Sequence, residues 1–420
     1  MPPPRASLKS FLASARAALA APASQRTAPL TLVVGNESAD LDSLCCAIVF
    51  AYIRSHSPPH SLHVPLSNLP RADLGLRTEM TAVLGRAGLS PSDLLTLSEF
   101  PMPSSSPSSG TPSARSGTDA AGLAPEDSRW VLVDHNAMTG PLKAAGYAAR
   151  VVGCVDHHVE ENQVPPDATP RVVEPCGSCM SLVVDECRAA WDELSRNDSR
   201  GDDDLVKLSL AAILLDTVDL TAKAKVKDKD VRAVQYLESK AQGGNFSRGK
   251  YFADISAVKE DISDLSFRDI FRKDYKEWED GGLTLGVSCV VQDFSYLLDR
   301  ADGSADAFLE HLSSWADERK LDVAAIMTTS HPGGEFQRHL LVWGLNPRGS
   351  AAARKFADTA RDGLELEQWH GGELDAGADG AAGGASAGRG QNTRFAWRQH
   401  DLAASRKQVA PLLREAMRMA

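Results

Sequence analysis

The sequence predicts an α/β fold with two domains. In its first half, short apolar runs alternate with segments of helical periodicity, which is the pattern of a parallel sheet joined by crossover helices. These apolar runs are continuous, as expected for strands that are buried on both faces. A second series of apolar runs follows a lysine-rich stretch. With 420 residues, the chain is long enough for two or three domains with separate cores.

The first expected element is a helix near the N-terminus, with Leu8, Phe11, Leu12 and Ala15 on its packed side. The segment MPPPRASLKSFLASARAALAAP contains no acidic residue and is rich in serine and alanine, which are also features of a mitochondrial transit peptide. We favour a packed surface helix and a cytoplasmic protein. A mitochondrial matrix form is the alternative.

Strands and helices then alternate along the chain. In the first domain we expect strands at 30–35, 130–134 and 151–156. Helices with an apolar stripe are expected at 44–53, 181–191 and 205–215. In the second domain we expect strands at 283–291, 321–329 and 339–345. The second domain is therefore also α/β, and it is the smaller of the two.

Changes in composition give the expected boundaries. They are an N-terminal arm at 1–29, a first domain at 30–230, a linker at 231–245 and a second domain at 246–420. Segments of about 101–124 and 371–390 are rich in Ser, Pro, Gly or Ala. Both have too little apolar surface to offset the entropy of ordering, so we expect disordered insertions there.

Charge and cysteine content exclude several classes of protein. A formal net charge of −11 argues against a general nucleic-acid binder, because phosphate backbones require a basic face. No apolar run is long enough to span a bilayer, so we expect no membrane partner. The seven cysteines are an odd count and several lie in apolar runs, which favours reduced, buried thiols over a disulfide framework.

Acidic turns at the ends of apolar runs are the strongest functional signal. The residues concerned are Asp40, Asp42, Asp134, Asp156, His157, His158 and Asp216. Ligands of open α/β sheets bind at the carboxyl ends of strands, so these side chains are expected to converge. Clustered carboxylates need cations, and Asp with His suits Mn²⁺, Mg²⁺ or Co²⁺. Taken alone, Asp40 or Asp42 would be a helix cap, and we assign no role to His135.

The motifs GNESADLDS, VDHN, VDHH and LLDT, in this order, resemble the DHH phosphoesterase superfamily. With EPCGS after the third motif, the set is similar to fungal cytosolic exopolyphosphatases, which are relatives of the manganese-dependent family II inorganic pyrophosphatases. Near the C-terminus, SRKQVAP is similar to the phosphate-binding motif of the domain that accompanies this group. The resemblance implies an active site in the cleft between a DHH domain and a smaller C-terminal domain.

The resemblance implies a site with two divalent metal ions, Mn²⁺ or Mg²⁺, with Co²⁺ as a further candidate. Asp40 and Asp134 would hold one ion. The ligands of the other would be Asp42, Asp134, His157 and Asp216. Asp134 would bridge the two ions, and it is one of two residues expected to be catalytic.

Other residues are implied around the metals. His158, the second catalytic residue, would contact the phosphate, and Asp156 would orient the histidines. Arg406 and Lys407 would bind the substrate from the second domain. Because Pro411 favours a helix that begins nearer Val409 or Ala410, we expect this basic pair in the preceding loop. Ser405 with Gln408 as a capping box is the alternative.

Asn36 is a departure from the pattern. Many members of the superfamily have a metal-binding histidine at this position, and an amide oxygen is a weaker ligand than imidazole. Asn36 is therefore expected either to bind the metal weakly or to contact a residue that binds it. Its presence weighs against a dedicated pyrophosphatase and favours the exopolyphosphatase branch.

The function that the resemblance implies is that of an exopolyphosphatase. It would hydrolyse the terminal phosphoanhydride bonds of inorganic polyphosphate, with metal ions, and release orthophosphate. The alternatives are an inorganic pyrophosphatase, a short-chain or cyclic-nucleotide phosphodiesterase of the same superfamily, and a non-catalytic binding protein that retains the fold. Polyphosphate is the expected partner. The oligomeric state is left open, a monomer included.

Overall fold

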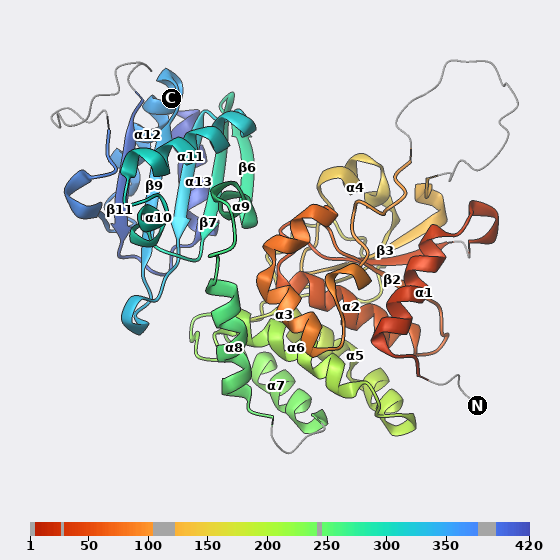
Figure 1. Cartoon of the computed structure of the whole chain (residues 1–420). Helices are drawn as coiled ribbons and strands as arrows, with labels where there is room; N and C mark the ends of the chain where they lie inside the picture. The colour runs from red at the N-terminus through yellow and green to blue at the C-terminus, as the bar shows by residue number, and fades with distance from the viewer. Residues whose placement is uncertain (1–4, 27–28, 104–121, 242–245, 377–391) are drawn as a thin grey trace, which may run out of the picture. The chain divides into compact units, whose positions relative to one another are not determined.

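The computed structural model describes residues 5–26, 29–103, 122–241, 246–376 and 392–420 (Figure 1). The chain divides into two compact units, Met1–Lys259 and Glu260–Ala420. Each unit combines helices with a sheet, which confirms the predicted α/β class. The insertions expected at about 101–124 and 371–390 lie largely outside the described residues.

Unit 1 is built on a parallel sheet with the strand order β2-β1-β3-β4-β5. The strands are β1 (Leu30–Val34), β2 (His63–Leu66), β3 (Ser128–Val133), β4 (Val151–Asp156) and β5 (Arg171–Val173). The three strands expected from sequence, now β1, β3 and β4, are confirmed. The edge strands β2 and β5 were missed because they are short, and β2 contains Pro65.

The central strands of unit 1 are buried on both faces. Val33 and Val131 contribute to the core on one face, whereas Leu32 and Trp130 contribute to the core on the other. Because side chains alternate across a strand, each central strand needs apolar residues at consecutive positions. This explains the continuous apolar runs of the sequence.

Helices cover both faces of this sheet. They are α1 (Leu8–Ala20), α2 (Leu41–Ser55), α3 (Thr78–Arg86), α4 (Gly140–Ala144), α5 (Cys179–Asn197), α6 (Asp202–Thr217), α7 (Asp228–Lys240) and α8 (Arg248–Glu260). Helix α2 packs against α5, α6 and strand β1, and nearly all its residues are buried. The three expected helices correspond to α2, α5 and α6. Helix α1 buries all four apolar residues predicted for its packed side.

Helices α7 and α8 extend unit 1 past the linker and the domain start that the composition suggested. Val234 and Leu237 of α7, and Ile255 of α8, are fully buried in the core of unit 1. Three of the five lysines of this stretch precede α7, and α7 itself is an amphipathic helix whose apolar side packs into unit 1. The division between the units lies after Lys259.

Unit 2 contains a mixed sheet with the strand order β10-β11-β9-β8-β7-β6. Its strands are β6 (Tyr275–Asp280), β7 (Leu283–Val290), β8 (Val323–Thr328), β9 (Arg338–Gly344), β10 (Leu366–Gln368) and β11 (Arg394–Gln399). Strands β7 and β8 are parallel, and the other pairs are antiparallel. The three strands expected in this half are confirmed as β7, β8 and β9.

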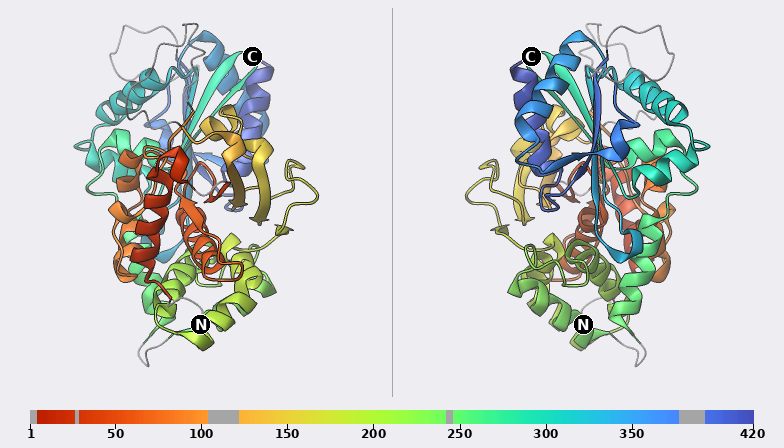
Figure 2. Two further views of the ribbon diagram at one scale, coloured as in Figure 1. Left: turned by 90° about the vertical axis from the view of Figure 1, so that its right-hand side faces the viewer. Right: turned by 90° about the vertical axis from the view of Figure 1, so that its left-hand side faces the viewer.

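Helices also cover both faces of the sheet of unit 2. One face carries α9 (Phe267–Lys273), α10 (Phe294–Arg300) and α11 (Ala305–Arg319). On the other face, α12 (Pro347–Ala360) and α13 (Arg406–Arg418) pack side by side (Figure 2). All seven cysteines of the chain are free thiols, and six are buried, with Cys289 half-buried. Within the described ranges, every helix is too short or too polar to cross a bilayer.

Candidate metal centre

The loops that follow β1, β3 and β4 bring most of the predicted site residues together at one edge of unit 1. The strand order reverses between β1 and β3, and such a reversal is where open α/β sheets bind their ligands. Two groups of side chains form there. One is Asp134, His157 and His158, and the other is Asp42, His157 and Asp216. Within each group, one ligand atom per residue lies within 4.8 Å of the others.

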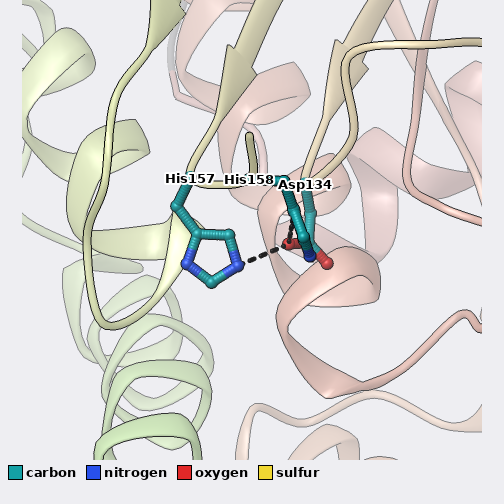
Figure 3. A group of neighbouring side chains, drawn as sticks. All are labelled: Asp134, His157 and His158. Carbon is teal, nitrogen blue, oxygen red and sulfur yellow. Dashed lines mark ion pairs between the residues drawn. The ribbon is translucent and has the colours of Figure 1, made fainter. Parts of the chain in front are cut away.

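Asp134 directly follows β3 and has a left-handed backbone with φ of +62°. Aspartate tolerates this conformation better than most residues. Its Oδ2 accepts hydrogen bonds from Ser43 Oγ at 2.6 Å and Asn36 Nδ2 at 2.9 Å. Its Oδ1 lies 3.2 Å from His157 Nε2 and 3.8 Å from His158 Nδ1 (Figure 3). One carboxylate oxygen is therefore held by donors, and the other faces the two imidazoles.

His157 has a defined ring orientation. Its Nδ1 donates a hydrogen bond to the carbonyl oxygen of Cys176 at 3.0 Å, which directs Nε2 towards Asp134. Burial acts to lower the pKa of His157, but the hydrogen bond to Asp134 and the charge of Asp42 outweigh it and raise the pKa to about 9. An imidazole whose Nδ1 is bound to a backbone carbonyl presents Nε2 to a metal.

His158 is oriented by Asp156. Its Nδ1 lies 2.8 Å from Asp156 Oδ1, and the other oxygen of Asp156 accepts from Asn136 Nδ2 at 2.6 Å. Burial favours a raised pKa for Asp156, yet its contacts with His158 and Asn136 bring the pKa below the usual value. The resemblance implied that Asp156 orients both histidines. In the structure it contacts His158, and the Cys176 carbonyl holds His157.

Asp42 is the second residue of α2, its carboxylate meets the N-terminus of α5, and the residue is only 2% exposed. It accepts hydrogen bonds from Cys179 N at 2.7 Å, Met180 N at 3.0 Å and Ser178 Oγ at 3.0 Å. Amides at a helix N-terminus stabilise a carboxylate where water is excluded. Burial and the nearby charge of Asp216 nevertheless raise the pKa of Asp42 to about 6. This carboxylate therefore favours a cationic neighbour.

Asp40 and Asn36 lie beside the two groups. Asp40 is the N-cap of α2, where its Oδ1 accepts from Ser43 N at 3.0 Å, and it belongs to neither group. Asn36 Oδ1 accepts from Ala39 N at 3.1 Å, so its amide nitrogen faces Asp134. Asn36 thus touches Asp134 as a hydrogen-bond donor, and its oxygen is engaged by its own turn.

Asp216 has a cationic neighbour within unit 1. It lies near the end of α6, and Lys225 Nζ is 2.9 Å from its Oδ2. Burial acts to raise the pKa of Asp216, but the charge and hydrogen bond of Lys225 lower it overall. Lys225 and His157, whose raised pKa keeps it protonated near neutral pH, offset some of the negative charge of the cluster. Sequence reasoning did not place Lys225 beside Asp216.

The donor set fits divalent cations. It combines carboxylate oxygens with a pre-oriented imidazole nitrogen, and these groups suit Mn²⁺, Mg²⁺ or Co²⁺. Burying several carboxylates together is unfavourable without such cations. His157 is common to both groups and Asp134 belongs to one of them. The bridging role that the resemblance implied for Asp134 stays a prediction.

The basic pair of unit 2 begins a helix. Helix α13 starts at Arg406, with Ser405 as its N-cap and Gln408 completing a capping box, so the predicted start nearer Val409 or Ala410 is wrong. Pro411 lies within the helix, although a proline there removes one backbone hydrogen bond and crowds the carbonyl of the preceding turn. Arg406 Nη2 lies 2.7 Å from Asp274 Oδ1. The side chain of Lys407 is exposed.

Sequence reasoning missed the residues that hold the ligands in place. The Cys176 carbonyl orients His157, Ser178 binds Asp42, and Ser43 binds Asp134. Ser178 had a local signal, because it directly precedes a helix and matches an N-cap. The carbonyl of Cys176 had none, because any residue type supplies one.

Comparisons with known proteins agree with this architecture. Residues 31–213 match the model of the DHH family, N-terminal domain, and residues 253–416 match that of the DHHA2 domain. A Schizosaccharomyces pombe protein named "Putative exopolyphosphatase" is 27% identical over 396 residues, which cover 92% of this chain and 91% of that protein. The chain also resembles the Rattus norvegicus "Exopolyphosphatase PRUNE1", with 28% identity over 324 residues. That match covers 76% of this chain and 63% of the relative's length.

A solved structure shares the fold. It is the putative family II inorganic pyrophosphatase of Methanococcus jannaschii, with a TM-score of 0.54 and 18% identity. The alignment covers 92% of this chain and 99% of that chain. The likeness thus extends over both units, and at this identity it supports the fold alone.

Proposed function

The chain carries a DHH family N-terminal domain followed by a DHHA2 domain, and on that premise we propose that it is a metal-dependent exopolyphosphatase. The observation that carries the proposal is the convergence of carboxylates and histidines at one edge of the parallel sheet. The substrate class is supported by the name of the S. pombe relative, which is similar along nine-tenths of both chains. We further place the enzyme in the cytoplasm.

Two divalent ions are part of the proposal. Their ligands would come from Asp42, Asp134, His157 and Asp216, with Asp40 at the exposed side. When bound, such a pair of ions lowers the pKa of a water molecule and draws charge from a phosphoryl oxygen. The chain contributes the fixed positions of the ligands, because Asp42 and Asp134 are held by donors from three segments.

His158 is suited to contact the terminal phosphate. Its side chain is partly exposed, and its Nδ1 is occupied by Asp156, so Nε2 is the nitrogen available to a substrate. Asp156 holds the ring in this orientation, so that Nε2 is placed for a hydrogen bond with a phosphoryl oxygen, where such a contact would stabilise the charge that develops. Arg406 and Lys407 would bind the remaining phosphates of the chain.

The test is phosphate release from long-chain polyphosphate, tripolyphosphate and pyrophosphate, each with Mg²⁺, with Mn²⁺ and with a chelator. We expect metal-dependent release from the long chain, and at least about a thousandfold loss in Asp134→Asn. Asparagine is a matched replacement because it has the same shape and tolerates the left-handed backbone. Release from pyrophosphate alone would instead indicate a pyrophosphatase. No release from any of the three would contradict the proposal and favour a cyclic-nucleotide substrate or a binding protein.

A further inference from the structure

A further buried carboxylate, that of Asp230, contacts the loop that holds two of the candidate metal ligands. Asp230 is the third residue of α7 and has no exposed surface. Neither the motifs nor the two groups of ligand side chains include it. It lies near the loop 176–178, which joins β5 to α5, and this loop contacts both His157 and Asp42.

Five donors surround the carboxylate of Asp230. Its Oδ2 accepts from Lys227 N at 2.7 Å and Gly177 N at 2.8 Å. Its Oδ1 accepts from Ser181 Oγ at 2.6 Å, Cys176 Sγ at 3.1 Å and Ser178 N at 3.2 Å. Four of these donors belong to the loop and the first turn of α5. A buried charge is tolerated when it is hydrogen-bonded in this way.

Two carboxylates therefore share the N-terminus of α5. Asp230 takes the amides of Gly177 and Ser178, and Asp42 takes those of Cys179 and Met180. Ser178 connects them, because its amide donates to Asp230 and its hydroxyl to Asp42. The position of Asp42 is thus coupled to that of Asp230 through one residue.

The same loop sets the orientation of His157. Asp230 binds the thiol of Cys176, and the carbonyl of Cys176 accepts the Nδ1 proton of His157. Because Gly177 has no side chain, the loop can lie close to Asp230 and Thr217. A Cβ there would lie 2.6 Å from Asp230 Oδ2 and 2.7 Å from Thr217 Cγ2. Any shift of this loop moves the acceptor of His157.

From these contacts we infer that Asp230 is a positioning residue of the metal centre. It fixes His157 and Asp42, two of the three side chains in one ligand group, without itself being a ligand. The inference rests on the proposed metal-dependent function, and it extends that function to α7. Side chains behind metal ligands typically change metal affinity about 10–100-fold when they are removed.

The test compares two buried aspartates of unit 1 in the full-length chain. In Asp230→Asn, the amide NH₂ must face at least one of the present donors, so the loop shifts. The matched control is Asp202→Asn. Asp202 is 2% exposed and accepts from Arg5 Nη1 at 2.7 Å and Trp191 Nε1 at 3.0 Å, at the other end of α6 from Asp216. Mn²⁺ affinity is measured by electron paramagnetic resonance.

A second measurement needs no metal. In ¹⁵N-histidine-labelled, chelator-treated protein, the Nδ1 proton of His157 is identified by its loss in His157→Gln, and its exchange with water is followed. We expect Asp230→Asn to weaken Mn²⁺ binding about 10–100-fold and to speed this exchange, with neither change in Asp202→Asn. If Asp230→Asn does not fold, Gly177→Ala displaces the same loop and should change both readouts in the same direction.

Wild-type affinity and exchange in Asp230→Asn would overturn the inference, and so would equal losses in Asp202→Asn. A wild-type chain that binds no Mn²⁺ would contradict the metal requirement of the proposed function. In that case the exchange of the His157 proton still decides whether Asp230 positions the ring. The two ideas can therefore fail separately.

Discussion

Each unit has a histidine with a largely buried side chain, His157 directly after β4 and His339 at the start of β9, and the two have opposite environments. His157 of unit 1 follows β4 and faces carboxylates, which outweigh burial and raise its pKa to about 9. His339 of unit 2 lies in β9, where it stacks on Phe294 with ring centroids 5.2 Å apart, and burial lowers its pKa to about 4. The neighbours of a histidine, and not its burial, thus distinguish a candidate ligand from a core residue.

The largest expected effect is on the pH dependence of stability without metal. His157 has a higher pKa in the folded chain than the ordinary 6.5, so its stabilisation is complete below pH 6.5 and is lost as the pH rises through about 9. His339 has a lower folded pKa, so protonation is unfavourable and stability is lost as the pH falls from 6.5 through about 4. Each effect is on the order of 3 kcal/mol.

Urea denaturation of chelator-treated protein from pH 4 to pH 9.5 measures both effects. We expect His157→Gln to remove the decline on the alkaline side and His339→Gln to reduce the decline on the acidic side. An alkaline decline that persists in His157→Gln would show that this ring does not carry the extra proton, and the contrast between the two histidines would then be wrong.

Asp42→Asn tests the carboxylate that the metal centre shares with α5. Both carboxylate oxygens of Asp42 accept hydrogen bonds, so the NH₂ group of the asparagine must face a backbone N–H or the Ser178 hydroxyl. A buried donor then loses its acceptor. We expect the free energy of unfolding to fall by about 1–3 kcal/mol and Mn²⁺ affinity to fall at least about 100-fold. Urea denaturation and Mn²⁺ titration measure these changes. Unaltered Mn²⁺ affinity would remove Asp42 from the ligands.

The smallest expected effects concern unit 2. Lys407→Gln removes an exposed charge, and we expect KM for long-chain polyphosphate to rise about tenfold with Mn²⁺ affinity unchanged. Asp274→Asn weakens the ion pair that holds Arg406, and we expect KM to change by only a few-fold because the guanidinium remains in place. Steady-state phosphate release measures both. A loss of Mn²⁺ affinity in either variant would contradict the assignment of these residues to substrate binding.

The sequence predicted those residues of the site whose position follows from the order and direction of the strands. Asp134 and His157 follow neighbouring parallel strands, and the carboxyl ends of such strands must lie at one edge, so their convergence could be predicted without coordinates. No such rule applies to Arg406 in unit 2. There, Ser405 as an N-cap favours a helix that starts at Arg406, whereas Pro411 favours a later start. The structure shows that the helix starts at Arg406.

Other contacts of the site could not be predicted, because the types of the residues that make them do not reveal them. The acceptor of His157 is a backbone carbonyl, and Asp230 is separated from Gly177 by 53 positions on a helix with an ordinary sequence. The lysine-rich stretch that begins before α7 suggested a domain boundary there, whereas unit 1 continues to Lys259. Contacts between segments that are distant in sequence need the fold before they can be recognised.

The α5 N-terminus also has a consequence for synthesis of the chain on the ribosome. Asp42 emerges first, but its amide partners at Cys179 and Met180 are made 137 and 138 residues later. Asp216 follows after a further whole helix and Asp230 later still. A nascent chain therefore exposes only scattered carboxylates for most of its translation. The two buried carboxylates at the N-terminus of α5 can therefore gain all their partners only once α7 has left the exit tunnel.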